Sequence, residues 1–197
     1  MTTEMQSQTG ANIWTAGGPF RFTREQVING PAAESLYRLY RRAFEPLAPR
    51  AAARQVLTQN EFLAQLADRR IDKYVAWESD SEPIGIVTVT RDLEAVPWIS
   101  PEYYATRFPE QWARNAIYYL GFTLVRPATR RTSFLDTIVR LSIEPLVAEK
   151  AVIAYDVCSY NNDVLGFSKR IAEMLTRFSH SQPQELDSQI YYGVNFA

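Results

Sequence analysis

A cluster of basic and hydroxyl side chains follows the apolar run that ends at Val125. It includes the guanidinium groups of Arg126, Arg130 and Arg131 and, at its end, the hydroxyls of Thr132 and Ser133. A helical pattern begins directly after it. Amides at a helix start are unpaired and the helix dipole is positive there, so phosphate groups bind readily. Arginine side chains add charge-assisted hydrogen bonds. The segment therefore predicts a site for phosphate or pyrophosphate.

Large aromatic side chains gather in residues 92–115, which contain three prolines and no strand pattern. Rings of this size must be buried against another surface. Tyr104 and Trp112 from this insertion, with Tyr119 from the following apolar run, are expected to line a substrate pocket. The segment thus predicts one wall of a substrate pocket.

Several other chemistries lack the residues they need. Cys158 is the only cysteine and His180 the only histidine, so an internal disulfide or a His/Cys zinc site is not available. The G-x-S-x-G motif of a serine hydrolase is absent from the sequence, which leaves His180 without a nucleophile partner. No metal is expected, and Cys158 is interpreted as a buried core thiol.

Hydrophobic periodicity supplies the elements that must position these residues. Helical spacing predicts helices over 31–44, 60–70 and 134–141 and after 161–163. β-Branched and aromatic runs predict strands at 74–77, 84–90, 117–125, 151–158 and 188–196. Asn60 is expected to cap the second helix, and Pro145 to kink or restart the third. The fold class is therefore α/β.

The N-terminal segment and the composition limit the domain organisation, the partners and the location that we expect. Residues 1–19 hold few large apolar side chains, so we expect a flexible leader followed by one domain over 20–197. With 21 basic and 22 acidic residues, the overall charge predicts no nucleic-acid partner and no membrane attachment. The start has no signal-peptide pattern, which favours a cytoplasmic location.

The order of elements over 20–196 and the segment after Val125 resemble the GNAT superfamily of acyl-CoA-dependent acyltransferases. The segment is similar to the family pattern V-x-P-x-x-R/Q-x-x-G-x-G/A, with Arg130 at the R/Q position. Ser133 and Leu135 stand at the two small positions. The resemblance implies a central mixed, mostly antiparallel sheet flanked by helices, with an insertion between the third and fourth family strands. It also implies that acetyl-CoA or another acyl-CoA binds this segment from Val125 onward.

The resemblance further implies roles for residues near the last helix. Asn161 or Asn162 matches the family asparagine at the donor site. The family's acid, a tyrosine that protonates the departing thiolate, would fall on Ser168 or Lys169. We therefore expect the acid to be a tyrosine nearby, and the candidates are Tyr155 and Tyr160.

The same resemblance implies direct attack of an amine on the thioester, helped by a carboxylate base. Glu94 is our candidate base, with Asp92, Glu102 and Glu110 as alternatives. A bulge at Gly121 is expected to free main-chain amides of 120–122 that would polarise the thioester oxygen.

Three functions remain open at this point. The first is an N-acyltransferase that acetylates a small-molecule amine. The second is an acyltransferase or synthase fed by an acyl carrier protein, favoured by Leu135, which narrows the pyrophosphate site. The third is a non-catalytic GNAT-like binding domain. A homodimer is also possible.

Overall fold

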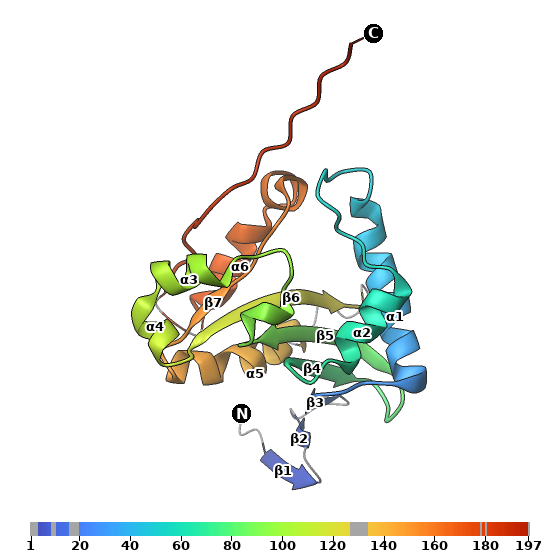
Figure 1. The fold of residues 1–197 in the computed structure, drawn as a ribbon. Helices are drawn as coiled ribbons and strands as arrows, with labels where there is room; N and C mark the ends of the chain where they lie inside the picture. The colour runs from blue at the N-terminus through green and yellow to red at the C-terminus, as the bar shows by residue number, and fades with distance from the viewer. Residues whose placement is uncertain are drawn as a thin grey trace.

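In the part of the chain that the structure describes, seven strands form one central sheet (Figure 1). The computed structural model describes residues 4–8, 11–15, 20–126, 134–177, 179 and 181–196, without the side chains of 4–8, 11–15, 134 and 135. The strands are β1 Glu4–Gln8, β2 Ala11–Thr15, β3 Arg21–Glu25, β4 Ile71–Trp77, β5 Pro83–Thr90, β6 Ile117–Val125 and β7 Val152–Ala154. They lie side by side in chain order, and only β6 and β7 are parallel. The predicted mixed, mostly antiparallel sheet is confirmed.

Helices cover both faces of this sheet (Figure 1). They are α1 Gly30–Phe44, α2 Gln59–Ala67, α3 Pro101–Arg107, α4 Pro109–Ala113, α5 Phe134–Ala148 and α6 Phe167–Leu175, with short turns η1 Glu45–Leu47, η2 Leu93–Ala95 and η4 Tyr160–Val164. One apolar core joins α1 and α2 to β4, β5 and β6, and a second joins α5 to the opposite face. The predicted insertion, between β5 and β6, consists of η2, α3 and α4.

Three rings in mutual contact tie α1 and α2 to the middle of β6. The centroids of Tyr40 and Phe62 are 4.7 Å apart, and those of Phe62 and Phe122 are 5.4 Å apart. Tyr40 and Phe62 are almost wholly buried. Burial of rings of this size contributes about 1.5–3 kcal/mol each. The two helices are thereby held over the middle of β6.

The start of α2 differs from the expectation. The cap is Thr58, not Asn60: the Glu61 amide donates to the Thr58 side chain, and the Glu61 carboxylate accepts from the Thr58 amide at 2.7 Å. This reciprocal pair is a capping box. It gives hydrogen-bond acceptors to the Thr58 and Glu61 amides, which would otherwise be unpaired. A helix capped at Asn60 would not include this pair.

The C-terminal third departs most from the sequence pattern. The helix α5 continues through Pro145 and ends at Ala148, so Pro145 does not restart it. The asparagines near 161–163 form the π-helical turn η4, and α6 begins only after Gly166, whose φ of 64° is left-handed. Glycine adopts this conformation without a steric penalty. The predicted strand over 188–196 is wrong for the single chain, because residues 181–196 belong to no helix or strand.

The described parts of the N-terminal segment form β1 and β2, which extend the sheet from β3. The division into a flexible leader and a domain from residue 20 stays a prediction. Among the described helices, none has the length and apolar character needed to cross a bilayer.

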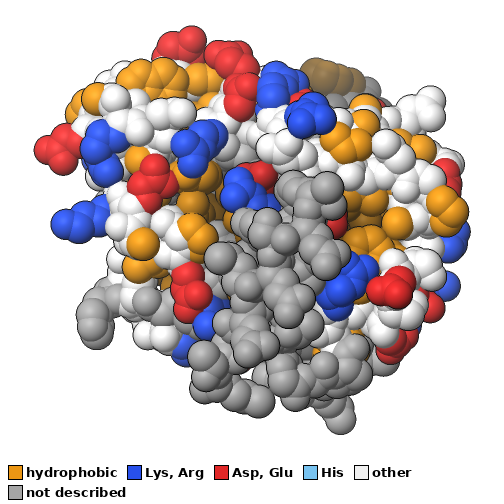
Figure 2. Space-filling model, turned by 90° about the horizontal axis from the view of Figure 1, so that it is seen from below, with side chains coloured by type: hydrophobic (Ala, Val, Ile, Leu, Met, Phe, Trp, Pro, Cys, Tyr) orange, Lys and Arg blue, Asp and Glu red, His pale blue; other side chains and the backbone are white. Residues whose placement is uncertain are grey.

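Charged side chains of both signs are interspersed over the face drawn in Figure 2. This distribution agrees with the nearly equal numbers of acidic and basic residues. An anion would therefore have to be bound by a local group of cations, and not by the field of the whole protein.

Candidate active site

A β-bulge interrupts β6 where it pairs with β5. The register shifts between Val87 and Val89, so that Thr88 faces two residues of β6, Gly121 and Phe122. An extra residue in one strand is the definition of a bulge. The bulge predicted at Gly121 is therefore confirmed.

The hydroxyl of Thr88 fills this bulge. The Phe122 amide donates to the Thr88 Oγ1 at 2.9 Å, and Thr88 is buried. A Cβ on Gly121 would lie 2.6 Å from the same oxygen, closer than real Cβ contacts allow. Residue 121 therefore has to be glycine, because a side chain there would collide with the Thr88 hydroxyl. The expectation that the bulge frees the amides is wrong for Phe122, whose amide has an internal acceptor.

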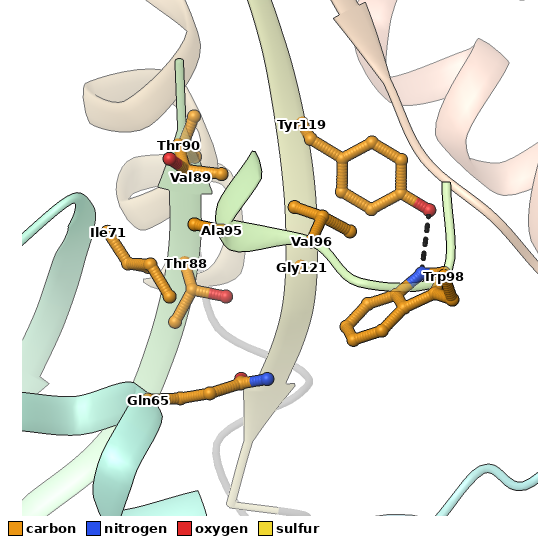
Figure 3. A pocket seen from close by; sticks show the side chains of 10 residues that line it. All are labelled: Gln65, Ile71, Thr88, Val89, Thr90, Ala95, Val96, Trp98, Tyr119 and Gly121. Carbon is orange, nitrogen blue, oxygen red and sulfur yellow. Dashed lines mark hydrogen bonds between the residues drawn. The ribbon is translucent and has the colours of Figure 1, made fainter. Parts of the chain in front are cut away.

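A small hollow opens over the bulge, between α2 and the insertion (Figure 3). It is lined by Gln65, Ile71, Thr88, Val89, Thr90, Ala95, Val96, Trp98, Tyr119 and Gly121. Its free volume is about 10 Å³, which is about the space of one water molecule. A space of this size accepts a single reacting group beside the sheet, while the rest of a substrate would lie outside it.

A hydrogen-bonded cluster of Trp98, Tyr119 and Asp156 stands at one wall of the hollow. The Trp98 indole donates to the Tyr119 hydroxyl and to Asp156 Oδ1, each at 3.3 Å, and the Tyr119 hydroxyl donates to the same carboxylate oxygen. Burial and the neighbouring carboxylate raise the pKa of Tyr119 far above its ordinary value. Its hydroxyl therefore stays protonated and orients the carboxylate.

The Asp156 carboxylate is placed by the separation of β6 from β7. These parallel strands pair only from Ile117 with Val152 to Tyr119 with Ala154, after which β6 continues alone with β5. The two strands thus start side by side, and their pairing ends at Tyr119 and Ala154. Asp156 lies two residues beyond the last pair and is exposed. The carboxylate there is open to solvent and is hydrogen-bonded to two side chains that line the hollow, Trp98 and Tyr119.

Comparison with known proteins identifies the fold. No family model and no curated protein matches the sequence. Among solved structures, an aminoglycoside acetyltransferase from an uncultured soil metagenomic sample, in complex with trehalose, is 13% identical with a TM-score of 0.52. The match covers 89% of this chain and 97% of that one. An aminoglycoside 6'-N-acetyltransferase from Acinetobacter haemolyticus is 13% identical with a TM-score of 0.50, over 88% of this chain and 99% of its own. This chain has the GNAT fold.

Within the GNAT fold, the residues predicted to bind the donor fall into two groups. Arg130, Arg131, Thr132 and Ser133 lie outside the described residues. Val125 is buried at the end of β6.

Arg126, the residue after Val125, forms ion pairs with Glu78 at 2.5 Å and with Glu82 at 3.3 Å. These carboxylates raise the pKa of Arg126. They also compete with any phosphate for its guanidinium.

A second hollow, of about 190 Å³, lies beside Arg126. It is lined by Ser35, Arg38, Leu39, Arg42, Glu82, Pro83 and Arg126. Three of these side chains are cationic and one is anionic, so the hollow has a local excess of positive charge. Spacing in the sequence did not indicate it, because the arginines on α1 are far from 126 in the chain.

The two tyrosines predicted as acids occupy different surroundings. Tyr155 is half-buried, and this burial raises its pKa, while a hydrogen bond joins it to Ser168. In the GNAT resemblance Ser168 is one of the two positions expected to carry the acid. Tyr160 lies in η4 beneath the Arg50 guanidinium, 5.1 Å from its ring centroid.

The neighbouring asparagines are exposed or half-buried at the same turn. Asn162 accepts from the Ser168 hydroxyl at 2.5 Å and donates to Asp163 at 3.0 Å. Asn161 precedes it in η4. Asn162 thus belongs to the same hydrogen-bonded group as Ser168, next to Tyr155.

Of the predicted substrate wall and the candidate base Glu94, the structure places only Tyr119 in the lining of the hollow. Tyr119 lines the hollow, and Tyr104 packs against the same apolar cluster, where burial and then Asp156 raise its pKa. Trp112 is 46% exposed on α4 and is not among the lining residues. Glu94 is exposed on η2 and does not line the hollow either.

Asp156 was missed as a candidate, although a signal for it existed. It is the one charged residue in the apolar run 151–158, which was interpreted as a buried strand. Charged side chains are rarely buried unless paired, so an Asp in such a run indicates a strand that ends early or a functional group. Among the described residues, no group of three potential metal ligands occurs.

The contact between Gly121 and Thr88 gives a direct test of the bulge. Gly121→Ala should lower the free energy of unfolding by about 1–3 kcal/mol, because the added methyl overpacks against the Thr88 hydroxyl. Chemical denaturation of this variant, of Thr88→Ala and of the double variant measures it. Removing the hydroxyl relieves the clash, so the double variant should be more stable than the sum of the two single losses. Strictly additive losses would contradict the close approach.

Proposed function

We propose that this protein is an acyl-CoA-dependent N-acyltransferase that transfers an acetyl group from acetyl-CoA to a small-molecule amine. The observation that carries the proposal is the position of Asp156, exposed beyond the point where β6 and β7 part and bonded to Tyr119 at the wall of the hollow. Such a carboxylate suits the removal of a proton from an amine nucleophile. As the single cysteine indicates, we place the enzyme in the cytoplasm.

The step would proceed by direct attack. The amine nitrogen bonds to the thioester carbonyl carbon, the carbon–sulfur bond breaks, and the proton from the amine passes to Asp156. The Tyr119 hydroxyl occupies one carboxylate oxygen, which leaves the other for the amine. No covalent enzyme intermediate is needed, because catalysis rests on positioning.

Tyr155 is our preferred acid for the departing thiolate. Its raised pKa keeps the hydroxyl protonated at neutral pH, and its hydrogen bond to Ser168 brings it next to the position expected for the family acid. Tyr160 remains an alternative, although the Arg50 guanidinium covers its ring. Of the two candidate bases, Asp156 is better placed than Glu94 because its carboxylate accepts hydrogen bonds from two side chains that line the hollow.

For the donor, we retain the phosphate site from Arg126 to Ser133, with Asn161 and Asn162 near the thiol end. The cationic hollow beside Arg126 supports this assignment, since Arg38 and Arg42 can add donors for phosphate oxygens. Glu78 and Glu82 would compete for Arg126 itself. Arg130 and Arg131 are therefore expected to contribute more than Arg126.

Our proposal for the acceptor is supported by the carboxylate and by the likeness to a solved aminoglycoside acetyltransferase. The soil metagenomic aminoglycoside acetyltransferase is also solved with sisomicin, at 14% identity, a TM-score of 0.51 and coverage of 89% of this chain and 97% of that one. We propose a small polyamine-like acceptor that enters between α2 and the insertion. Tyr104 and Tyr119 would form its apolar wall.

The proposal is tested by release of free thiol from acetyl-CoA with a panel of amines. The panel should contain aminoglycosides, simple polyamines and amino-acid amides, and a thermal shift with each acyl-CoA should accompany it. A ligand that binds only the native state raises the melting temperature by mass action. Amine-dependent thiol release is expected. Absence of both a shift and release with every acyl-CoA would refute acyl-CoA-dependent transfer.

A further inference from the structure

Gln65 lines the hollow over the bulge with a side-chain amide that makes no hydrogen bond to any residue the structure describes. The other polar side chains of the lining are all hydrogen-bonded within the protein: Thr88, Thr90, Trp98 and Tyr119. Gln65 is half-buried, so its amide is partly shielded from water. A polar group left without a partner at the wall of a hollow indicates a group that binds a ligand.

The last turn of α2 holds Gln65 in place. Leu66 is wholly buried, and its carbonyl accepts from the Ile28 amide at 3.0 Å. The Gln65 carbonyl accepts from the Asp68 amide at 3.3 Å, and the Asp68 carbonyl accepts from the buried Lys73 ammonium. The backbone is thus fixed on both sides of Gln65. A ligand that contacts this side chain needs to order little of the protein, which favours binding.

The lining of the hollow places hydrogen-bonding groups on different sides of a very small space. Gln65 comes from α2, whereas Trp98 comes from the insertion and Tyr119 from β6 (Figure 3). Trp98 and Tyr119 both donate to Asp156, the proposed base. The free volume of about 10 Å³ is about that of one water molecule. An NH₂ group has about the size of water and likewise donates hydrogen bonds, so the hollow fits the nitrogen of a primary amine.

We propose that Gln65 is a substrate-binding residue whose side-chain oxygen accepts a hydrogen bond from the reacting amine, and that the hollow selects primary amines over N-substituted ones. The inference rests on the proposed acyl transfer and specifies its acceptor. A primary amine carries two N–H bonds. Asp156 takes the proton of one as the carbon–nitrogen bond forms, and Gln65 accepts from the other, which directs the nitrogen lone pair at the thioester carbon.

The size of the hollow supplies the selectivity. An N-methyl group adds a second heavy atom beside the nitrogen, and a space of about 10 Å³ holds only one. Forcing a methyl group into a filled space displaces the surrounding side chains at a cost in free energy. The Gln65 side chain bounds this space, so shortening it should admit the methyl group.

A competing role for Gln65 is donation from its side-chain NH₂ to the thioester oxygen, since the Phe122 amide is already bonded to Thr88. We favour the amine because the same hollow is lined by Trp98 and Tyr119, which are bonded to the proposed base. Glutamate at this position separates the two roles, because a carboxylate accepts hydrogen bonds and cannot donate them.

The first measurement is kcat/KM for transfer from acetyl-CoA to the best primary amine of the panel. Gln65→Met keeps the length of the side chain without an acceptor and should lower kcat/KM by roughly 10- to 100-fold, the contribution of a hydrogen bond to a group that becomes charged. Gln65→Glu keeps an acceptor and should retain most of the wild-type value. A loss in Gln65→Glu as large as in Gln65→Met would overturn the inference and assign the amide to the thioester.

Gln59→Met is the matched control. Gln59 lies on the same helix, is exposed and does not line the hollow, so this variant should keep the wild-type kcat/KM. Thermal melting of all three variants should show an intact fold. An equal loss of kcat/KM in Gln59→Met and Gln65→Met would mean that α2 is only perturbed, and would overturn the inference.

The second measurement is the ratio of kcat/KM for that amine to kcat/KM for its N-methyl derivative. Wild type should prefer the primary amine by roughly 10- to 100-fold, and Gln65→Ala should lower this ratio. Equal use of both amines by wild type, or an unchanged ratio in Gln65→Ala, would overturn the inference and leave acyl transfer intact. A wild type that releases no thiol with any amine would instead refute the proposed function, and this inference with it.

Discussion

Replacing Asp156 by Asn is expected to lower kcat/KM for acyl transfer by about 100- to 10,000-fold, the usual contribution of a general base. Asparagine keeps an oxygen in place of Oδ1, so the hydrogen bonds from Trp98 and Tyr119 can persist. The amide cannot take a proton from the amine. The variant therefore removes the proton transfer and preserves the geometry around it. Steady-state kinetics with acetyl-CoA and the best amine of the panel measure the effect.

Glu94→Gln is the matched control, since it makes the same chemical change on an exposed carboxylate that does not line the hollow. It should leave kcat/KM unchanged. Both variants should melt close to wild type, because Asp156 and Glu94 are exposed. If Glu94→Gln loses activity and Asp156→Asn keeps it, Glu94 is the base, and Asp156 only positions Tyr119.

The local periodicity of the sequence was sufficient for the central strands and the first helix, but it did not predict β1, β2 or β3. The apolar runs at 74–77, 84–90 and 117–125 became β4, β5 and β6, and the pattern over 31–44 became α1. Each of these patterns indicates which face of a helix or strand is buried, and burial of that face stabilises the element.

Features that depend on contacts between distant residues could not be predicted in this way. The bulge at Gly121 was expected, but its occupation by the Thr88 hydroxyl was not, since the two residues meet only through the pairing of β5 with β6. The same holds for the cluster of Trp98, Tyr119 and Asp156, which joins three separate segments.

The C-terminal residues 188–196 are the opposite case: their local pattern predicts a strand, and the single chain does not form one there. Residues 188–196 alternate as a strand should, yet they form none. Strand formation requires a neighbouring edge as well as a pattern.

Arg130→Ala should weaken binding of acetyl-CoA by roughly 10- to 100-fold. The loss corresponds to about 1.5–3 kcal/mol, the usual contribution of a hydrogen bond to a charged group such as phosphate. Arg130 lies outside the described residues, so the expectation rests on the sequence motif and on the cationic hollow beside Arg126. Calorimetric titration with CoA and acetyl-CoA at two salt concentrations measures the effect. Salt should weaken wild-type binding more than binding by the variant, because one screened contact is already missing.

Arg69→Ala serves as the control, because Arg69 is an exposed arginine in the turn before β4 and its loss changes the net charge equally. Its affinity for CoA should match that of wild type, which separates a specific contact from a general charge effect. Equal weakening by both variants would mean that only net charge matters. If wild type itself binds neither CoA nor acetyl-CoA at millimolar concentration, Leu135 has closed the pyrophosphate site. A donor carried by an acyl carrier protein, or a non-catalytic binding role, would then replace the acyl-CoA proposal, because neither depends on that site.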